Sequence, residues 1–251
     1  MKTIVLINKN SSDNPQFKQI LFDKLIERLK YFNYDYDLIE AEYKSDRYGP
    51  LPLPGSLFEF KIKELYKILG NYDENETILY VDSFDVYPLS GPDEVYQKYQ
   101  SFDADLVFSY EKNCWPNILN LDRFYVKKDY INTGVFIGTN AKLRKVMDYI
   151  IALDDVQFYD DQHAWSLVTR LMRENIKVEI DLKSNIALCL NDRDISGYGI
   201  SENRLYNSID NSRPCFIHGN NQSLKKYVED KNKNIINTLL NIDPTKVLDF
   251  L

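Results

Sequence analysis

Apolar runs and helical segments alternate over the first 110 residues, and this alternation constrains the fold more than any other feature of the sequence. Short runs rich in β-branched and aromatic residues predict four buried strands, at 2–8, 35–43, 77–81 and 104–110. Segments with the apolar spacing of amphipathic helices begin near Pro15 and Ser56, and Ser90-Gly91-Pro92-Asp93 is the signature of a third helix N-terminus. Such alternation is typical of a parallel, doubly wound α/β sheet, which binds ligands at the carboxyl ends of its strands.

The rest of the chain is less regular but continues the α/β pattern. It predicts helices and short strands, with the helices near 140–153, near 160–173 and at the C-terminal end, and the strands near 135–140, 178–182, 186–190 and 214–221. The Gly- and Asn-rich stretch 191–214 is expected to be irregular. No internal repeat, low-complexity tract or linker interrupts the sequence, so residues 1–251 are predicted to form a single domain.

Charge and hydropathy argue against two classes of partner. The formal net charge is −7 without a long Lys/Arg cluster, which disfavours nucleic acid or an anionic membrane as the main partner. No segment approaches the roughly 20 apolar residues of a membrane span, and MKTIVLINKN lacks a signal-peptide pattern. We therefore expect no membrane span and a cytoplasmic location, in a bacterial or viral setting.

Cys114, Cys189 and Cys215 are too far apart to indicate a disulfide framework or a zinc cluster.

The stretch YVDSFDVY places Asp82 and Asp85 at the end of a predicted buried strand. Strand interiors exclude unpaired carboxylates, so this spacing indicates either a solvated turn or a site for a hard cation. The sequence has no Gly-rich phosphate loop, but a divalent cation could screen the charge of a nucleotide diphosphate. His218 in FIHGNN is either a structural histidine or a third ligand, and a nitrogen ligand would favour Mn²⁺ over Mg²⁺.

Three further motifs carry polar groups, and each has a structural and a functional interpretation. Asp160 and Asp161 in FYDDQHAW either stabilise a helix N-terminus or supply a base or a counter-charge beside a sugar ring. In SYEKNCWPN, Glu111 follows a strand, and Trp115 either packs in the core or stacks on a sugar. Asn132 in YINTGVFIG either begins a tight turn or presents an amide to sugar hydroxyls.

Taken in order, these motifs and the segment EIDLKSNIAL resemble the glycosyltransferase domain of the multifunctional procollagen lysyl hydroxylases, over about residues 2–230. The resemblance implies a GT-A-type fold, a Rossmann-like mixed sheet flanked by helices. It also implies a nucleotide-binding half at about 1–110 and a sugar- and acceptor-binding half at about 111–251. The implied donor is a UDP-sugar and the implied cofactor is Mn²⁺.

The family's functional positions carry over residue by residue. The resemblance implies metal ligation by Asp82, Asp85 and His218. It implies a catalytic or substrate-lining role on the sugar and acceptor side for Glu111, Trp115, Asn132, Asp160, Asp161 and Asn220, with Asp161 nearest the reacting centre. It implies contacts to the nucleotide or its phosphates for Asn8, Lys61, Asp82, Ser83, Gly219 and Lys225, with Tyr43 or Tyr48 stacking on uracil.

Two segments depart from the family pattern. The family's H-G-N-G-P-T-K reads HGNNQSLK here, and its F-Q-N-L-N-G reads ALCLND. The expected activity is a Mn²⁺-dependent transfer of glucose or galactose from a UDP-sugar to a hydroxyl acceptor, by resemblance hydroxylysine or galactosyl-hydroxylysine of a collagen-like protein. The alternatives are a GT-A transferase of the glycogenin or lipopolysaccharide type with another acceptor, and a UDP-sugar-binding module without transfer activity. Donor, acceptor, stereochemistry and oligomeric state stay open.

Overall fold

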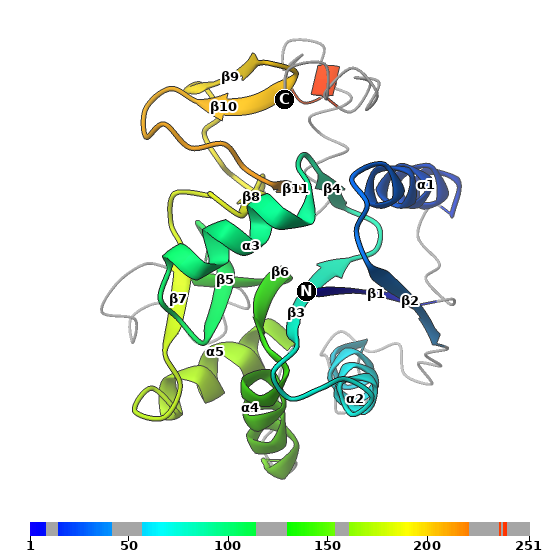
Figure 1. The fold of residues 1–251 in the computed structure, drawn as a ribbon, viewed down its shortest axis with the longest axis vertical. Coiled ribbons are helices and arrows are strands. Elements are labelled where there is room, and N and C mark those ends of the chain that lie inside the picture. The colour runs from blue at the N-terminus through cyan, green and yellow to red at the C-terminus, as the bar shows by residue number, and fades with distance from the viewer. Residues whose placement is uncertain are drawn as a thin grey trace.

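The computed structural model describes residues 1–8, 15–41, 57–113, 130–153 and 161–220, together with 236, 238 and 239. Figure 1 shows these residues as one curled sheet with its helices and a small separate hairpin. The strands are β1 (Lys2–Asn8), β2 (Tyr36–Ala41), β3 (Thr77–Asp82), β4 (Val86–Pro88), β5 (Leu106–Glu111), β6 (Tyr130–Thr139), β7 (Val178–Asp181), β8 (Ala187–Cys189), β9 (Tyr198–Ser201), β10 (Arg204–Asn207) and β11 (Phe216–His218). The helices are α1 (Pro15–Tyr31), α2 (Leu57–Leu69), α3 (Pro92–Ser101), α4 (Asn140–Ala152) and α5 (Asp161–Leu171).

The large sheet is mixed, which confirms the GT-A-type expectation and corrects the simpler expectation of an all-parallel sheet. Its order is β2-β1-β3-β6-β5-β8-β11-β4, and β7 pairs with β5. β1 is parallel to both β2 and β3, whereas β6 is antiparallel to β3 and β5. Apolar runs do not encode strand direction, and an antiparallel neighbour needs no crossover helix. The sequence pattern therefore could not reveal the reversal at β6.

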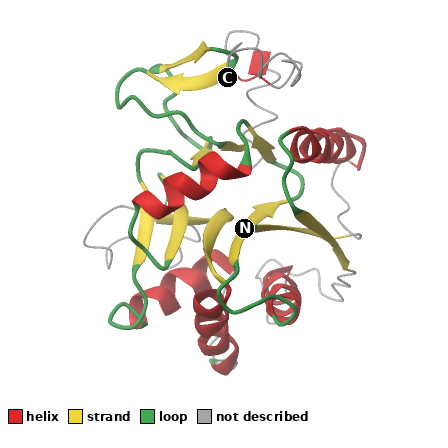
Figure 2. Cartoon of the chain, in the orientation of Figure 1, coloured by secondary structure: helices red, strands yellow, loops and turns green. Residues whose placement is uncertain are grey.

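Both faces of the sheet are buried, and alternate residues of β3 contribute to one face or the other. Ile78 and Tyr80 belong to an apolar cluster with residues of α2, α4 and α5. Leu79 and Val81 belong to a second cluster, which includes residues of α1 and α3. Because successive side chains of a strand point to opposite faces, one short apolar strand serves both layers. Figure 2 shows these helices around the sheet.

Trp165 anchors α5 against the sheet. Its side chain is 1% exposed, and its ring lies 5.5 Å from that of Phe108 and 5.3 Å from that of Phe136, centroid to centroid. Buried aromatic pairs of this kind contribute about 0.5–1.5 kcal/mol each beyond their buried area. This packing fixes the direction of α5 and therefore the position of its first residue, Asp161.

Two segments contain more regular structure than the sequence pattern predicts. The stretch expected to be irregular contains the hairpin β9–β10, in which Ser201 pairs with Arg204. Its two turn residues, Glu202 and Asn203, have φ values of 54° and 56°, as a two-residue hairpin turn requires. The turn contains no glycine and was therefore missed. β6 begins at Tyr130 rather than near 135, so Asn132 lies inside a strand and does not begin a tight turn.

Two further expectations concern the membrane and the cysteines. None of the described helices is long and apolar enough to cross a membrane. Cys189 and Cys215 are buried and free, whereas Cys114 lies outside the described residues. Most of the expected C-terminal helix also lies outside them.

Candidate metal centre and active site

Three side chains suited to a metal come together where β3, β4 and β11 meet. Asp82 ends β3, Asp85 lies in the turn before β4, and His218 ends β11. β11 pairs antiparallel with β4, and the Gly219 backbone N–H donates to the Asp85 carbonyl at 2.7 Å. In a flat sheet, β3 and β11 would be separated by four inter-strand steps of about 4.8 Å, roughly 19 Å. The curl of the sheet visible in Figure 1 therefore assembles this cluster.

The three ligand atoms are close enough to share one ion. His218 Nε2 lies 3.4 Å from Asp85 Oδ1 and 3.9 Å from Asp82 Oδ2. One ligand atom from each residue lies within 4.8 Å of the others. Two carboxylate oxygens and one imidazole nitrogen form a set that suits Mn²⁺, so the residues present fit the implied cofactor. Burial alone would lower the pKa of His218, but the Asp85 carboxylate outweighs it and holds this pKa well above its ordinary value.

A glycine and a cysteine lie against the ring of His218. A Cβ on Gly134 would lie 2.1 Å from His218 Cε1, so only a glycine leaves room for the imidazole. Cys189 Sγ is 3.7 Å from Nδ1, and β8 and β11 pair Cys189 with His218 in parallel register. This arrangement directs Nε2 towards the carboxylates. The motif YINTGVFIG contains Gly134, but nothing local in the sequence indicates this role.

A bulge in β6 brings the Gly134 segment to the site. Phe108 pairs with Phe136, but the next residue, Ser109, pairs with Asn132, so three residues of β6 are additional at this point. Side chains satisfy the local backbone, because Asn132 Oδ1 accepts the Gly134 N–H at 2.9 Å and Ser109 Oγ donates to the Val135 carbonyl at 2.9 Å. Bulges are frequent beside active sites, where they redirect a side chain.

Lys61 connects the metal cluster to Asp161. Its Nζ lies 3.0 Å from Asp82 Oδ1 and 2.8 Å from Asp161 Oδ2, and it donates to the Thr133 carbonyl at 3.1 Å. The Thr133 hydroxyl donates to the same oxygen, Asp161 Oδ2, at 2.6 Å. Burial alone would lower the pKa of Lys61, but Asp161 and Asp82 outweigh it and hold this pKa well above its ordinary value. A permanent cation therefore lies between the two carboxylates, and Tyr80 Oη donates to Asp82 Oδ1 at 2.9 Å.

Glu111, Asn132 and Asn220, expected on the sugar and acceptor side, also lie together. Asn132 Nδ2 donates to Glu111 Oε2 at 3.1 Å, and Asn220 Nδ2 donates to Glu111 Oε1 at 2.7 Å. All three side chains are buried. The structure thus gathers these residues beside the metal cluster, because Asn220 follows His218 by two positions in the chain.

The remaining expected site residues divide into two groups. Ser83 is buried directly after Asp82, and Asn8 ends β1 at the same edge of the sheet as Asp82. Outside the described residues lie Trp115, Asp160, Tyr43, Tyr48 and Lys225. Their expected roles stay predictions.

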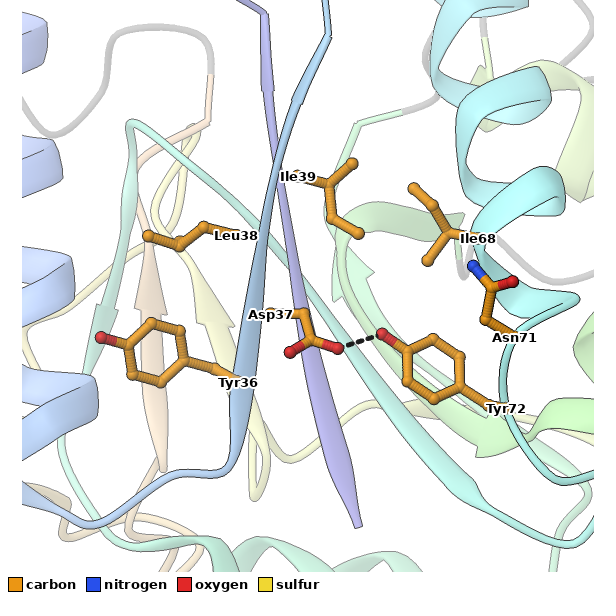
Figure 3. A pocket seen from close by; sticks show the side chains of 7 residues that line it. All are labelled: Tyr36, Asp37, Leu38, Ile39, Ile68, Asn71 and Tyr72. Carbon is orange, nitrogen blue, oxygen red and sulfur yellow. Dashed lines mark hydrogen bonds between the residues drawn. The ribbon is translucent and has the colours of Figure 1, made fainter.

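A second pocket lies away from this cluster, between β2 and the end of α2. Figure 3 shows its lining residues, which are Tyr36, Asp37, Leu38, Ile39, Ile68, Asn71 and Tyr72. The Tyr72 hydroxyl donates to Asp37 across it. None of these residues belongs to the expected donor or metal site.

Comparison with known proteins identifies the fold and the family of the chain. A crystal structure of a glycosyltransferase involved in the glycosylation of the major capsid of PBCV-1 shares the fold, with a TM-score of 0.52 and 14% sequence identity over 88% of this chain and 93% of that one. The mixed sheet is that of a GT-A glycosyltransferase. The family described as the PLOD GT domain matches residues 20–241, and the chain therefore belongs to this family of glycosyltransferases.

Two curated relatives illustrate the relationship. An uncharacterized protein, R699 of Acanthamoeba polyphaga mimivirus, is 31% identical over 170 residues, which cover 66% of this chain and 36% of the relative. The multifunctional procollagen lysine hydroxylase and glycosyltransferase LH3 of Rattus norvegicus is 29% identical over 171 residues, which cover 64% of this chain and 22% of the relative. The chain thus spans between about a fifth and about a third of the length of these relatives.

Proposed function

We propose that this glycosyltransferase uses Mn²⁺ to transfer glucose or galactose from a UDP-sugar to a hydroxyl group. The observation that carries the proposal is the juxtaposition of two units. One is the cluster of Asp82, Asp85 and His218, whose ligand atoms lie within 4.8 Å of one another. The other is Asp161, which is linked to Asp82 through Lys61 at 2.8 Å and 3.0 Å.

The charge of the donor explains why a cation is needed. A UDP-sugar carries a diphosphate, and the protein has a formal net charge of −7. Mn²⁺ bound by this cluster would neutralise the diphosphate and act as a Lewis acid on the departing UDP. Asp82 and Asp85 would hold the cation, and His218 would add the nitrogen that favours Mn²⁺ over Mg²⁺.

Asp161 is the carboxylate proposed to lie nearest the reacting sugar. Lys61 and Thr133 both contact Asp161 Oδ2, and together they fix the carboxylate at the start of α5. A fixed carboxylate can stabilise positive charge that develops on a sugar ring, or accept a proton from the acceptor hydroxyl. Lys61 also supplies a positive charge beside Asp82, where we place the phosphates.

The proposed acceptor is hydroxylysine or galactosyl-hydroxylysine in a collagen-like polypeptide. The support is family membership together with relatives that are named as procollagen lysine hydroxylases and glycosyltransferases. A GT-A transferase with another glycan acceptor is the second candidate, favoured by the fold shared with a glycosyltransferase involved in the glycosylation of the major capsid of PBCV-1. The cytoplasmic location stays a prediction from the sequence.

The test is UDP release from UDP-glucose and from UDP-galactose, each with Mn²⁺ and with a chelator. Each reaction is repeated with hydroxylysine and galactosyl-hydroxylysine peptides, and the peptide mass is measured. We expect metal-dependent release from one donor and a gain of one hexose on one peptide. Release without any peptide gain would favour another acceptor. If the protein binds UDP but releases none from either UDP-sugar under any condition, the result would contradict transfer and indicate a binding module.

A further inference from the structure

Glu111 is surrounded by side-chain amides from four separate segments. Each amide donates one N–H to the Glu111 carboxylate: Asn132 Nδ2 at 3.1 Å and Gln162 Nε2 at 2.9 Å bind Oε2, while Asn191 Nδ2 at 3.3 Å and Asn220 Nδ2 at 2.7 Å bind Oε1. These donors come from β6, from α5 and from the turns that follow β8 and β11.

This arrangement uses the full accepting capacity of the carboxylate. A carboxylate has about four acceptor sites, two on each oxygen, and four amide donors fill them. Glu111 is also only 3% exposed. A substrate hydroxyl could reach either oxygen only by displacing an amide, which would leave a buried donor without a hydrogen-bond partner. The surroundings of Glu111 are therefore those of a structural anion and not of a proton acceptor.

Two of the amides sit beside the residues of the proposed active site. Gln162 directly follows Asp161 in the first turn of α5, and Asn220 follows His218 by two residues. Asn191 joins this turn to Glu111, because its backbone N–H donates to Asn220 Oδ1 at 3.1 Å and its side chain donates to Glu111 Oε1. One carboxylate thus links the segment that carries Asp161 to the segment that carries His218.

The third link runs to the glycine beneath the imidazole. Asn132 donates to Glu111 through Nδ2 and accepts the Gly134 N–H through Oδ1 at 2.9 Å. Because the negative Glu111 fixes which end of the amide faces it, Oδ1 is left facing Gly134. The bulge that makes room for His218 is therefore oriented by the same carboxylate.

We propose that Glu111 is a positioning residue, with Gln162 and Asn191 as two further positioning residues that act through it. Together they hold the His218 turn, the Gly134 bulge and the Asp161 helix start in one mutual geometry. The proposal rests on the proposed function only for the purpose of this geometry, which is metal-dependent sugar transfer. The bonds that Gln162 and Asn191 donate to Glu111 are the contacts through which they act.

The test uses three variants and one matched control. Glu111→Gln keeps the shape of the side chain but replaces an acceptor by an amide that carries its own donors. Gln162→Met and Asn191→Ala each remove a single donor and are expected to fold even if Glu111→Gln does not. Asn140→Ala is the control, because Asn140 Nδ2 also makes three buried or partly buried bonds, to the carbonyls of Leu69, Tyr72 and Asp73, and Asn140 follows the end of β6 that is opposite to the end paired with Glu111.

Two readouts do not require turnover. Hydrogen–deuterium exchange of the full chain should lose protection together in the segments that the carboxylate links, at 130–134, 161–165, 187–191 and 216–220, in the Glu111, Gln162 and Asn191 variants. Electron paramagnetic resonance of added Mn²⁺ should show weaker binding by about 10- to 100-fold for Glu111→Gln, the range typical of outer-shell partners. Asn140→Ala should lower the melting temperature and reduce the exchange protection of the residues around position 140. It should leave Mn²⁺ affinity unchanged.

Two results would overturn the proposal. One is loss of UDP release by Glu111→Gln with wild-type exchange and wild-type Mn²⁺ affinity, because Glu111 would then act directly on the substrate. The other is an equal loss of Mn²⁺ affinity in Asn140→Ala, since the effect would then be general destabilisation. A wild-type protein that releases no UDP would contradict the proposed function alone, because the exchange pattern still tests the network.

Discussion

Asp82 and Asp85, beside the end of β3, and Glu111, at the end of β5, are carboxylates at the same edge of one sheet, but their surroundings differ. The side chains of Asp82 and Asp85 are 30% and 33% exposed and face His218 and Lys61, groups that can exchange their interactions for those of a cation. Glu111 is 3% exposed and is surrounded by four neutral amides. Partly exposed carboxylates such as Asp82 and Asp85 are suited to binding a cation. A buried carboxylate whose acceptor sites are all hydrogen-bonded, such as Glu111, is suited to holding segments of the chain in place.

The largest expected effect comes from removing a ligand of the partly exposed set. Asp82→Ala deletes one carboxylate of the cluster and one partner of Lys61. We expect Mn²⁺ affinity and Mn²⁺-dependent UDP release to fall by more than about 100-fold, because even outer-shell partners of a metal cost about 10- to 100-fold. The control is Asp93→Ala, a change at an exposed carboxylate in the first turn of α3. Comparable losses in both variants would contradict a specific ligand role.

Asp161→Asn separates binding from chemistry. The amide keeps the size of the side chain and can still accept the Thr133 hydroxyl, but it has no negative charge and is a poor base. Turnover should fall by about 100- to 10,000-fold, the usual contribution of a positioned acid or base, while Mn²⁺ and UDP affinities stay near the wild-type values. Steady-state kinetics and calorimetric titration measure the two effects. Unchanged turnover would exclude Asp161 from the reaction.

Gly134→Ala tests the space that the bulge provides. The added Cβ would lie 2.1 Å from His218 Cε1, so either the ring or the backbone must move. Overpacking of this kind costs about 1–3 kcal/mol in the free energy of unfolding, and displacement of the ring should also weaken Mn²⁺ binding by about 10-fold or more. Gly199→Ala is the control, because a Cβ there meets nothing within 4 Å. Wild-type stability together with wild-type Mn²⁺ affinity in Gly134→Ala would contradict the close approach of Gly134 to His218.

The smallest expected effect is a dependence on pH. Because the pKa of His218 is raised well above its ordinary value of about 6.5, the imidazole of the metal-free protein keeps its proton to a higher pH than an ordinary histidine does. A metal ligand must lose that proton, so Mn²⁺ affinity should rise with pH, by up to about tenfold per unit below the folded pKa. In the metal-free protein the same shift adds stability at acid pH, which is lost as pH rises through the folded pKa.

Calorimetry of Mn²⁺ binding in buffers with different ionisation enthalpies measures the proton that is released. His163, the other histidine of the chain, is the control residue, and His163→Asn should leave the release unchanged. Mn²⁺ binding without proton release at neutral pH would contradict the ligand role of His218.

Much of the fold follows from local patterns. The strand at 77–81 and the helix that begins near Pro92 were predicted from apolar runs and from the signature Ser90-Gly91-Pro92-Asp93, and the structure contains both. What local patterns do not contain is pairing. The antiparallel direction of β6 and the glycine-free turn at Glu202 and Asn203 depend on which strand lies alongside which.

The site shows the same division between local and long-range information. The carboxylates of YVDSFD and the histidine of FIHGNN are informative by residue type and position, and the structure brings them together. Gly134 and Gln162 could not be assigned from the sequence, because their roles depend on His218 and Glu111, which are distant in the chain. Only the curl of the sheet and the bulge in β6 bring these partners into contact.

The measurement that tests the central claim most directly is the affinity for UDP, by calorimetric titration, with Mn²⁺ and with a chelator. The wild-type protein and Asp82→Ala are compared under both conditions. The account predicts that Mn²⁺ strengthens UDP binding to the wild-type protein and has no such effect on Asp82→Ala. Equal UDP affinity of the wild-type protein with and without Mn²⁺ would contradict the assignment of Asp82, Asp85 and His218 as a metal site for the nucleotide.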